Sequence, residues 1–461
     1  MREKILATLH ELRKYALDKG IDAGFYYQEE DSYLMRFANS AISLNTNEHI
    51  VRVEVTVYDG RKRASYEMIT NLDKLDEMKQ GVDTAAEMVK HVQALNYEPT
   101  IPTYTETFAD ESSYDPELAK LSNAERLAYF NTVSAGFESD DIKLSGIFSS
   151  GTNVIALINT RSEHSLFTVT SDAQITVVLS HLTLKWEVTA EQSAQRKSDL
   201  DAERLHRDLA FLLERYQNDQ PQQLPLGKYD IVFGPQAIAD MLNMWQWIGP
   251  NGGSMKRGFS FLTEEMLGKK VFSEKFSLID DTTRRESFPF KVDFYGMKRG
   301  VFPIVEKGVF KAFTWFQDDA DEFGAKPTGH TVMHKSMVVN GGDKKVGSLE
   351  ELASLPREKD ILYIPYIHYM NIVNPSAGVI TGSSRFGALL LKKNGSVVVP
   401  YNVRLTQSLL EIFGDKVEWL SEGQTVYNIS ASYGARNPQA IIVPTFMKVN
   451  DLEISHSNSS Y

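Results

Sequence analysis

Residues 50–68 read IVRVEVTVYDGRKRASYEM, and this stretch contains the clearest strand in the chain. Valines alternate with polar residues along its first half, which predicts one buried face and one solvent-facing face. The valines are Val51, Val53, Val55 and Val57. The pair Asp59-Gly60 predicts a tight turn that returns the chain as an antiparallel hairpin.

Amphipathic helices flank this hairpin in the sequence. Apolar residues recur at helical spacing in residues 2–19, and a second stripe follows Asn71, which we expect to cap a helix over about residues 72–89. GFYYQ at residues 24–28 and YLMRFAN at residues 33–39 predict two short strands. Helices packed on antiparallel strands predict an α+β layer.

The pattern along the chain predicts three regions. An N-terminal α+β domain covers residues 1–98, and a central α+β region covers residues 99–220. Residues 217–227, QNDQPQQLPLG, are polar and contain proline, which is typical of a linker. The remaining residues 221–461 contain many strands with short turns, which predicts a large, mostly antiparallel and barrel-like β domain.

Composition excludes several classes of function. The chain has 461 residues, a net charge of −12 and no cysteine. The negative charge repels phosphate backbones, so we expect no direct nucleic-acid partner. Without cysteine, a metal ion would need His, Asp or Glu ligands. No run of about 18 apolar residues occurs and the first helix is not a signal peptide, so we expect a cytoplasmic protein without a membrane span.

The closest pair of histidines is His330-x-x-x-His334, in PTGHTVMHKSMVV. On a helix this pair could chelate a metal ion. Its β-branched, glycine- and proline-flanked context instead favours a loop or strand, in which four residues span about 13 Å, too far for two ligands of one ion. A structural role, a substrate-facing role and a metal site all remain open for the pair.

Two other patterns indicate no catalytic chemistry. The loop GPNGGSMKRG at residues 249–258 lacks the spacing of a phosphate-binding loop and predicts a flexible connection. Gly-x-Ser-x-Gly does not occur, so a nucleophile elbow has no support.

The order of segments resembles the PmbA/TldD family of metallopeptidases, whose members are also labelled modulators of DNA gyrase. LPLGKYDIVFGPQAIADML at residues 224–242 is similar to the family's entry into its C-terminal domain. VDFYGMKRGVFPIVEKGVFKAF at 292–313, FGAKPTGH at 323–330 and AGVITGSSRFGALLLKKNGSVVVPYNVRL at 377–405 follow in family order. The resemblance runs nearly from end to end.

The resemblance implies two kinds of subunit. The TldD kind holds zinc with a His-Glu-x-x-x-His helix and a later cysteine, whereas the TldE or PmbA kind lacks the helix motif. In this chain the metal helix would fall on residues 243–248, where Asn243 and Ile248 replace the histidines. The cysteine would fall near Ser430 to Ser432. The resemblance therefore implies the TldE kind, with no zinc of its own and no catalytic residue.

From this resemblance we expect a non-catalytic subunit that binds or positions extended peptide, paired with a TldD-like zinc peptidase subunit or with a second copy of itself. The peptide would lie along a sheet edge as an added strand. One alternative is a self-sufficient metallohydrolase with a relocated site at His330, His334 and a carboxylate such as Asp293. Another is a stand-alone peptide-binding protein.

Overall fold

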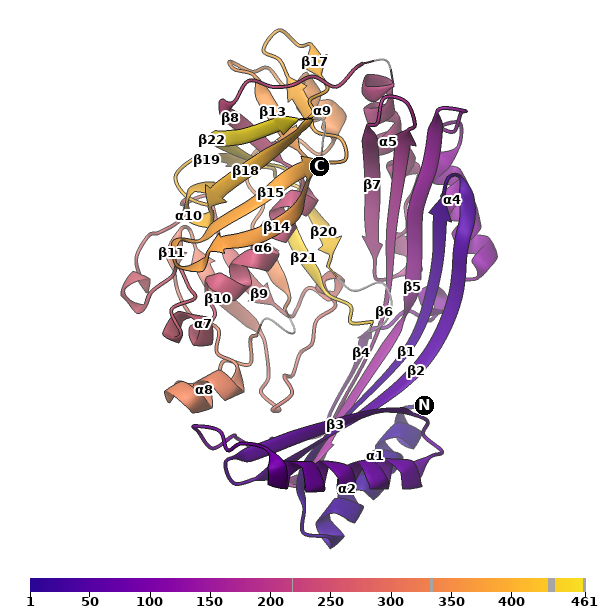
Figure 1. Cartoon of the computed structure of the whole chain (residues 1–461), viewed down its shortest axis with the longest axis vertical. Coiled ribbons are helices and arrows are strands. Elements are labelled where there is room, and N and C mark those ends of the chain that lie inside the picture. Colours follow the sequence, from indigo (N-terminus) through magenta and orange to yellow (C-terminus); the bar gives the residue numbers. More distant parts are fainter. Residues whose placement is uncertain (218, 332–334, 430–435, 459–461) are drawn as a thin grey trace.

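The computed structural model describes residues 1–217, 219–331, 335–429 and 436–458, and they form a mixed α+β fold with three sheets (Figure 1). Among the described strands, neighbours are antiparallel except β4 with β6, β12 with β21 and β13 with β8. The predicted α+β class is therefore confirmed. Barrel-like closure of the C-terminal strands stays a prediction.

The N-terminal half is built on a seven-stranded sheet in the order β3-β2-β1-β5-β6-β4, with β7 also paired to β6. Its strands are β1 (Asp22–Ala38), β2 (Ala41–Asp59), β3 (Lys62–Thr70), β4 (Phe108–Ser113), β5 (Ile142–Asn159), β6 (Ser162–His181) and β7 (Glu187–Ala194). The predicted hairpin is β2 and β3, with Asp59 opposite Lys62 across the turn. Strands from both ranges 1–98 and 99–220 share this sheet, and the predicted division into domains stays a prediction.

Helices cover the two ends of this sheet (Figure 1). They are α1 (Arg2–Asp18), α2 (Leu75–His91), α3 (Pro116–Ala119), α4 (Asn123–Ser134) and α5 (Ala202–Tyr216). Ser122 and Glu125 form a capping box at the start of α4. Asn71 does not cap α2, because the chain first makes a turn in which the Lys74 amide donates to the Asn71 carbonyl, and the helix begins at Leu75.

The two short strands predicted over residues 24–39 are one continuous strand, β1. The polar residues between the predicted strands do not interrupt it, because Gln28 and Glu30 are buried and satisfied by partners far away in the sequence. Glu30 accepts from Arg52 of β2 and from the Arg436 amide, and Gln28 donates to the Arg436 carbonyl. The polar residues therefore wrongly predicted a break in the strand, because their tertiary partners cannot be seen in the local sequence.

The C-terminal half contains the other two sheets. One has six strands in the order β11-β10-β9-β12-β21-β20: β9 (Leu278–Asp281), β10 (Val301–Glu306), β11 (Val309–Phe310), β12 (Met337–Val339), β20 (Gln424–Asn428) and β21 (Ala440–Pro444). The other has nine strands: β8 (Gly227–Phe233), β13 (Ile361–Ile364), β14 (Tyr366–Asn374), β15 (Val379–Arg385), β16 (Leu389–Leu391), β17 (Val397–Val398), β18 (Asn402–Ser408), β19 (Val417–Leu420) and β22 (Met447–Asn458).

The described residues of this half also form the α-helices α6 (Pro235–Ile248), α7 (Gly252–Lys256), α8 (Gln317–Phe323), α9 (Leu349–Ser354) and α10 (Leu409–Ile412). The loop expected to be flexible contains α7, because Gly252 and Gly253 pack directly against Trp315 and Asp319, where a Cβ atom would overlap both side chains. The expected linker is also partly packed: Leu224 lies in the C-terminal core.

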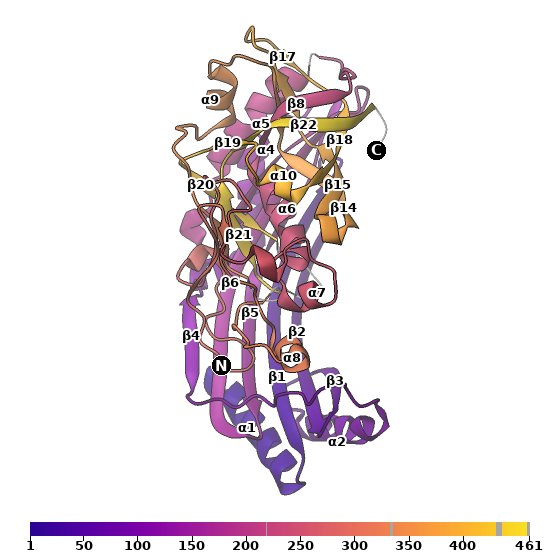
Figure 2. The ribbon, with the colours of Figure 1, turned by 90° about the vertical axis from the view of Figure 1, so that its left-hand side faces the viewer.

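One hydrophobic core joins the two halves of the molecule. Leu209 and Leu212 of α5 share a cluster with Leu389 of β16 and with Phe446. The long strands run along the length of the molecule and the C-terminal half lies beside them (Figures 1 and 2). Among the described helices, none is both long and apolar enough to cross a bilayer.

Arg436 fixes the C-terminal half to the face of the long sheet. Its guanidinium is 1% exposed, and Nε donates to Asp172 Oδ1 of β6 at 2.6 Å. Nη1 donates to Ser149 of β5 and Nη2 donates to the Asp172 carbonyl. Gly151 leaves room for this side chain, because a Cβ atom there would lie 3.0 Å from Arg436 Nε.

Replacing Arg436 should destabilise the protein strongly. Arg436→Met leaves the Asp172 carboxylate buried without a cation, and we expect a loss of about 3 kcal/mol in the apparent free energy of unfolding, measured by urea denaturation. Adding Asp172→Asn should recover part of that loss. Arg161→Met is the control, because its ion pair with Asp22 is half exposed and should contribute below about 1 kcal/mol. Equal losses in the two single variants would contradict the anchoring role.

Candidate functional site

A cleft of about 670 Å³ lies between the two halves. One wall is formed by β7 and α5 of the N-terminal half, and the other by the start of α6, the start of β14 and the whole of β20. β7 and β20 contact one another across this boundary. A cavity of this size accommodates several residues of an extended peptide.

The first turn of α6 reaches the cleft because of the sequence that precedes it. β8 leads into Gly234, where a Cβ atom would lie 3.0 Å from the Pro365 backbone, and Pro235 occupies the first turn of the helix. Pro235 and Gln236 line the cleft. The rest of the helix is anchored in the C-terminal core, where Trp245 is fully buried.

Two carboxyl groups beside the cleft have strongly raised pKa values. Burial raises the pKa of Glu191 on β7 to about 8, although a hydrogen bond from the Tyr366 hydroxyl opposes this effect. The negative charge of Asp240 on α6 raises the pKa of Glu191 further. Burial raises the pKa of Asp240 itself to about 7. Carboxyl groups perturbed in this way mark candidate binding sites.

Residues of the predicted former metal helix face two environments. Asn243 Oδ1 accepts hydrogen bonds from Lys335 Nζ at 2.9 Å and from Gln246 Nε2 at 2.8 Å. Ile248 is 4% exposed and belongs to the C-terminal core. Burial lowers the pKa of Lys335 to about 8. The side chain that contacts Asn243 is therefore the buried amine of Lys335. The sequence could not predict this contact, because the two residues are 92 positions apart.

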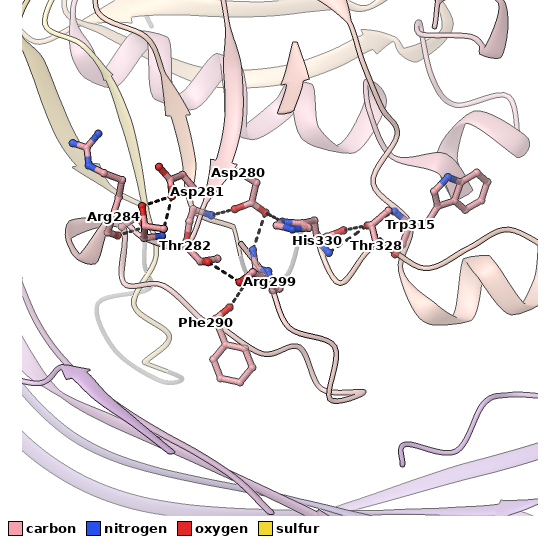
Figure 3. Close-up of polar contacts among 12 residues, drawn as sticks. Asp280, Asp281, Thr282, Arg284, Phe290, Arg299, Trp315, Thr328 and His330 are labelled. Atoms are coloured by element: carbon pink, nitrogen blue, oxygen red, sulfur yellow. Dashed lines mark hydrogen bonds and ion pairs between the residues drawn. The ribbon is translucent and has the colours of Figure 1, made fainter. Parts of the chain in front are cut away.

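His330 lies in a buried ion cluster with Asp280 and Arg299 (Figure 3). Asp280 Oδ2 lies 2.8 Å from His330 Nδ1 and 2.7 Å from Arg299 Nη2, and the His330 ring stacks on Phe302. Burial would raise the pKa of Asp280, but Arg299 and His330 together lower it below its ordinary value. One ring nitrogen of His330 is therefore engaged by Asp280.

The other residues of the alternative metal site divide between described and undescribed parts. His334 lies outside the described residues. Asp293 Oδ1 accepts hydrogen bonds from the amides of Tyr295 and Met297, which shape a turn. Within residues 1–217, 219–331, 335–429 and 436–458, no group of three or more His, Cys, Asp and Glu side chains could hold a metal ion.

Ser430 and Ser432, at the predicted cysteine position, lie outside the described residues. Their described neighbours, however, contact the long sheet. Asn428 receives a hydrogen bond at its carbonyl from Gln174, and Arg436 binds Asp172.

Comparisons with known proteins identify relatives of this chain. Residues 226–456 match the family model of the PmbA/TldA metallopeptidase C-terminal domain. TldE from Thermococcus kodakarensis has a similar structure, with a TM-score of 0.83 and 16% identity over 97% of this chain and 100% of that one. No curated protein sequence matches.

Two further crystal structures are similar, and each is of a "putative modulator" of DNA gyrase. The protein from Thermotoga maritima has a TM-score of 0.78 and 16% identity over 97% of this chain and 99% of that one. The protein from Bacteroides thetaiotaomicron has a TM-score of 0.76 and 16% identity over 97% of this chain and 98% of that one. At such low identity, these matches show a shared fold.

The raised pKa of Glu191 predicts a specific pH dependence of stability. The folded state holds the Glu191 proton more tightly than the unfolded state, so the stabilisation is complete at about pH 4 and is lost as the pH rises towards 8. Glu191→Gln does not titrate. Its stability relative to the wild type should rise between pH 5 and 8, by up to about 1.4 kcal/mol per pH unit.

Chemical denaturation at pH 5, 6, 7 and 8 measures this difference. Glu203→Gln is the control, because Glu203 is exposed on α5 and its variant should follow the wild type at every pH. A constant difference between Glu191→Gln and the wild type would contradict the burial of this carboxyl group.

Proposed function

The chain belongs to the PmbA/TldD metallopeptidase family, and on this basis we propose that it is a TldE-type subunit, which binds extended peptide and has no catalytic zinc of its own. Its partner is a TldD-type subunit that carries the zinc ion. The subunit positions the peptide, and the partner cleaves it.

The contact between Lys335 and Asn243 is the observation that carries this proposal. A catalytic zinc ion needs about three ligands with available lone pairs, together with a base for its bound water. Asn243 Oδ1 already accepts two hydrogen bonds, one of them from the Lys335 amine. Ile248 is apolar and buried, and Met244 occupies the place of the base. These residues do not fit a zinc ion.

The two sheet edges at the cleft support peptide binding. Among the described strands, β20 pairs only with β21, and β7 pairs only with β6. Residues 424–428 of β20 all line the cleft. An extended peptide of five residues spans about 17 Å and can add to such an edge through backbone hydrogen bonds. Recognition of this kind tolerates many peptide sequences.

An apolar surface on the C-terminal half supports a protein partner. Trp247 at the end of α6, Phe259, and Tyr369 and Val373 of β14 are all exposed. α6 and β14 contact one another, and Ser376 beyond β14 bonds to the Gly258 carbonyl beside Phe259. β14 is also the last strand of its sheet among the described residues. We name these four side chains the apolar surface, and we assign it to the zinc-carrying subunit.

Zinc content and peptide cleavage test the proposed function. We expect the purified chain to contain far less than one zinc ion by elemental analysis and to leave an unfolded peptide intact. Addition of a TldD-type subunit from the same genome should start cleavage, faster than that subunit achieves alone. Stoichiometric zinc with cleavage by this chain alone would overturn the proposal.

Tyr369→Asp should disrupt the subunit complex. Tyr369 has a φ of 51°, a conformation that Asp adopts more readily than most residues, so the variant should fold. A charge buried at the interface should weaken the complex at least about tenfold, as measured by analytical ultracentrifugation. Tyr114→Asp, at an exposed tyrosine of the N-terminal half, should leave the complex intact. Unchanged affinity in Tyr369→Asp would contradict the assignment, and self-association through this surface would identify a second copy as the partner.

A further inference from the structure

Building on the proposed peptide-binding function, we propose that the cleft contains a subsite for a basic side chain of the peptide, formed by Glu191 of β7 with Gln236 and Asp240 of α6. Neither the family match nor the sequence pattern assigns a role to these residues.

The two carboxyl groups have no basic partner in the described part of the chain. The charge of Arg204 acts on Glu191, but the Arg204 guanidinium pairs with Asp208 at 3.5 Å and donates to the backbone carbonyl of Glu191, not to its carboxyl group. The charge of Asp240 affects Glu191 more strongly than the charge of Arg204 does. Among the described residues, neither Glu191 nor Asp240 therefore forms an ion pair, although Arg204 and Arg207 line the same cleft.

Gln236 gives independent support for a missing ligand. Its side chain is 6% exposed and lines the cleft, and its Nε2 donates to Asp240 Oδ2 at 2.7 Å. The Oε1 atom of Gln236 accepts no hydrogen bond from any described residue. The Oγ atom of Ser193, on the β7 wall of the cleft, also has no hydrogen-bond partner among the described residues. Buried acceptors without partners are costly, so a donor supplied by a ligand would stabilise this arrangement.

A guanidinium or ammonium group fits these acceptors better than a metal ion does. Metal sites need several convergent carboxylates or imidazoles, and no such group of three occurs in the described residues. The hydroxyls of Tyr366 and Tyr427 also lie near Glu191. A guanidinium offers five planar donors and can bond to carboxylates and an amide oxygen at once. The subsite therefore favours arginine.

The geometry of the cleft relates this subsite to the peptide path. Glu191 and Gln236 line the same cleft as residues 424–428 of β20. A side chain projecting from a strand added at β20 would then reach Glu191 on the facing β7 wall and Gln236 on the wall that β20 shares with α6. A basic residue would fix the register of a peptide that is otherwise held by its backbone.

Paired peptides test the subsite on the full chain. One fluorescein-labelled unfolded peptide carries a central arginine, and the other carries citrulline, which has the same shape without the charge. We expect the wild type to bind the arginine peptide about tenfold more tightly, by fluorescence anisotropy. Glu191→Gln and Asp240→Asn should reduce this preference below about threefold, with little effect on the citrulline peptide. Glu203→Gln should retain the preference.

The variants should fold, because burial favours the uncharged form of both carboxyl groups when no ligand is bound, and thermal melting monitored by circular dichroism checks this. Equal affinity of the wild type for both peptides would overturn the subsite while leaving peptide binding intact.

N-acetylarginine amide separates the proposed subsite from the proposed peptide-binding function. If neither peptide binds but this compound raises the Tm of the wild type and not of Glu191→Gln, the subsite stands and the proposed function fails. If the compound and its citrulline analogue act alike and neither peptide binds, both proposals are wrong.

Discussion

The buried ion pair between Arg436 and Asp172 is the contact on which the arrangement of the two halves depends. It joins a segment near the end of the chain to the face of the long sheet, and each guanidinium nitrogen of Arg436 donates a hydrogen bond, to the Asp172 carboxylate, the Ser149 hydroxyl or the Asp172 carbonyl. A charge removed from water is tolerated only when it is satisfied in this way. The cleft lies between surfaces that this contact and the shared hydrophobic core hold together.

Helix α6 connects the core of the C-terminal half to the chemistry of the cleft. Its buried residues, such as Trp245 and Ile248, fix its position, so that Gln236 lines the cleft with Asp240 hydrogen-bonded to it. Asn243 meets Lys335 one turn further on. In the proposed function, this helix has exchanged a metal-ligating face for a hydrogen-bonded one. The buried amine of Lys335 supplies a donor in a place where a zinc site would need lone pairs.

Local patterns predicted several elements well. The alternation of Val51 to Val57, the turn at Asp59-Gly60 and the helical spacing over residues 2–19 each depend on neighbours within a few residues, and the structure confirms all three. The continuous strand β1 was missed because the partners of Glu30 are Arg52 and the Arg436 amide. Helix α7 was missed because its glycines predicted a flexible loop. They are glycines because Trp315 and Asp319, which are distant in the sequence, pack directly against them.

The sequence by itself determined the α+β class, the lack of thiolate ligands and the polar or apolar character of residues 243–248, because composition and short-range periodicity encode these properties. Only the tertiary structure decided the cleft and its charge. Glu191 and Asp240 are about 50 residues apart with no shared motif, and their pKa values are raised by burial that exists only in the folded chain. A carboxyl group in a sequence is an ordinary acid, and its surroundings in the fold determine whether it remains one.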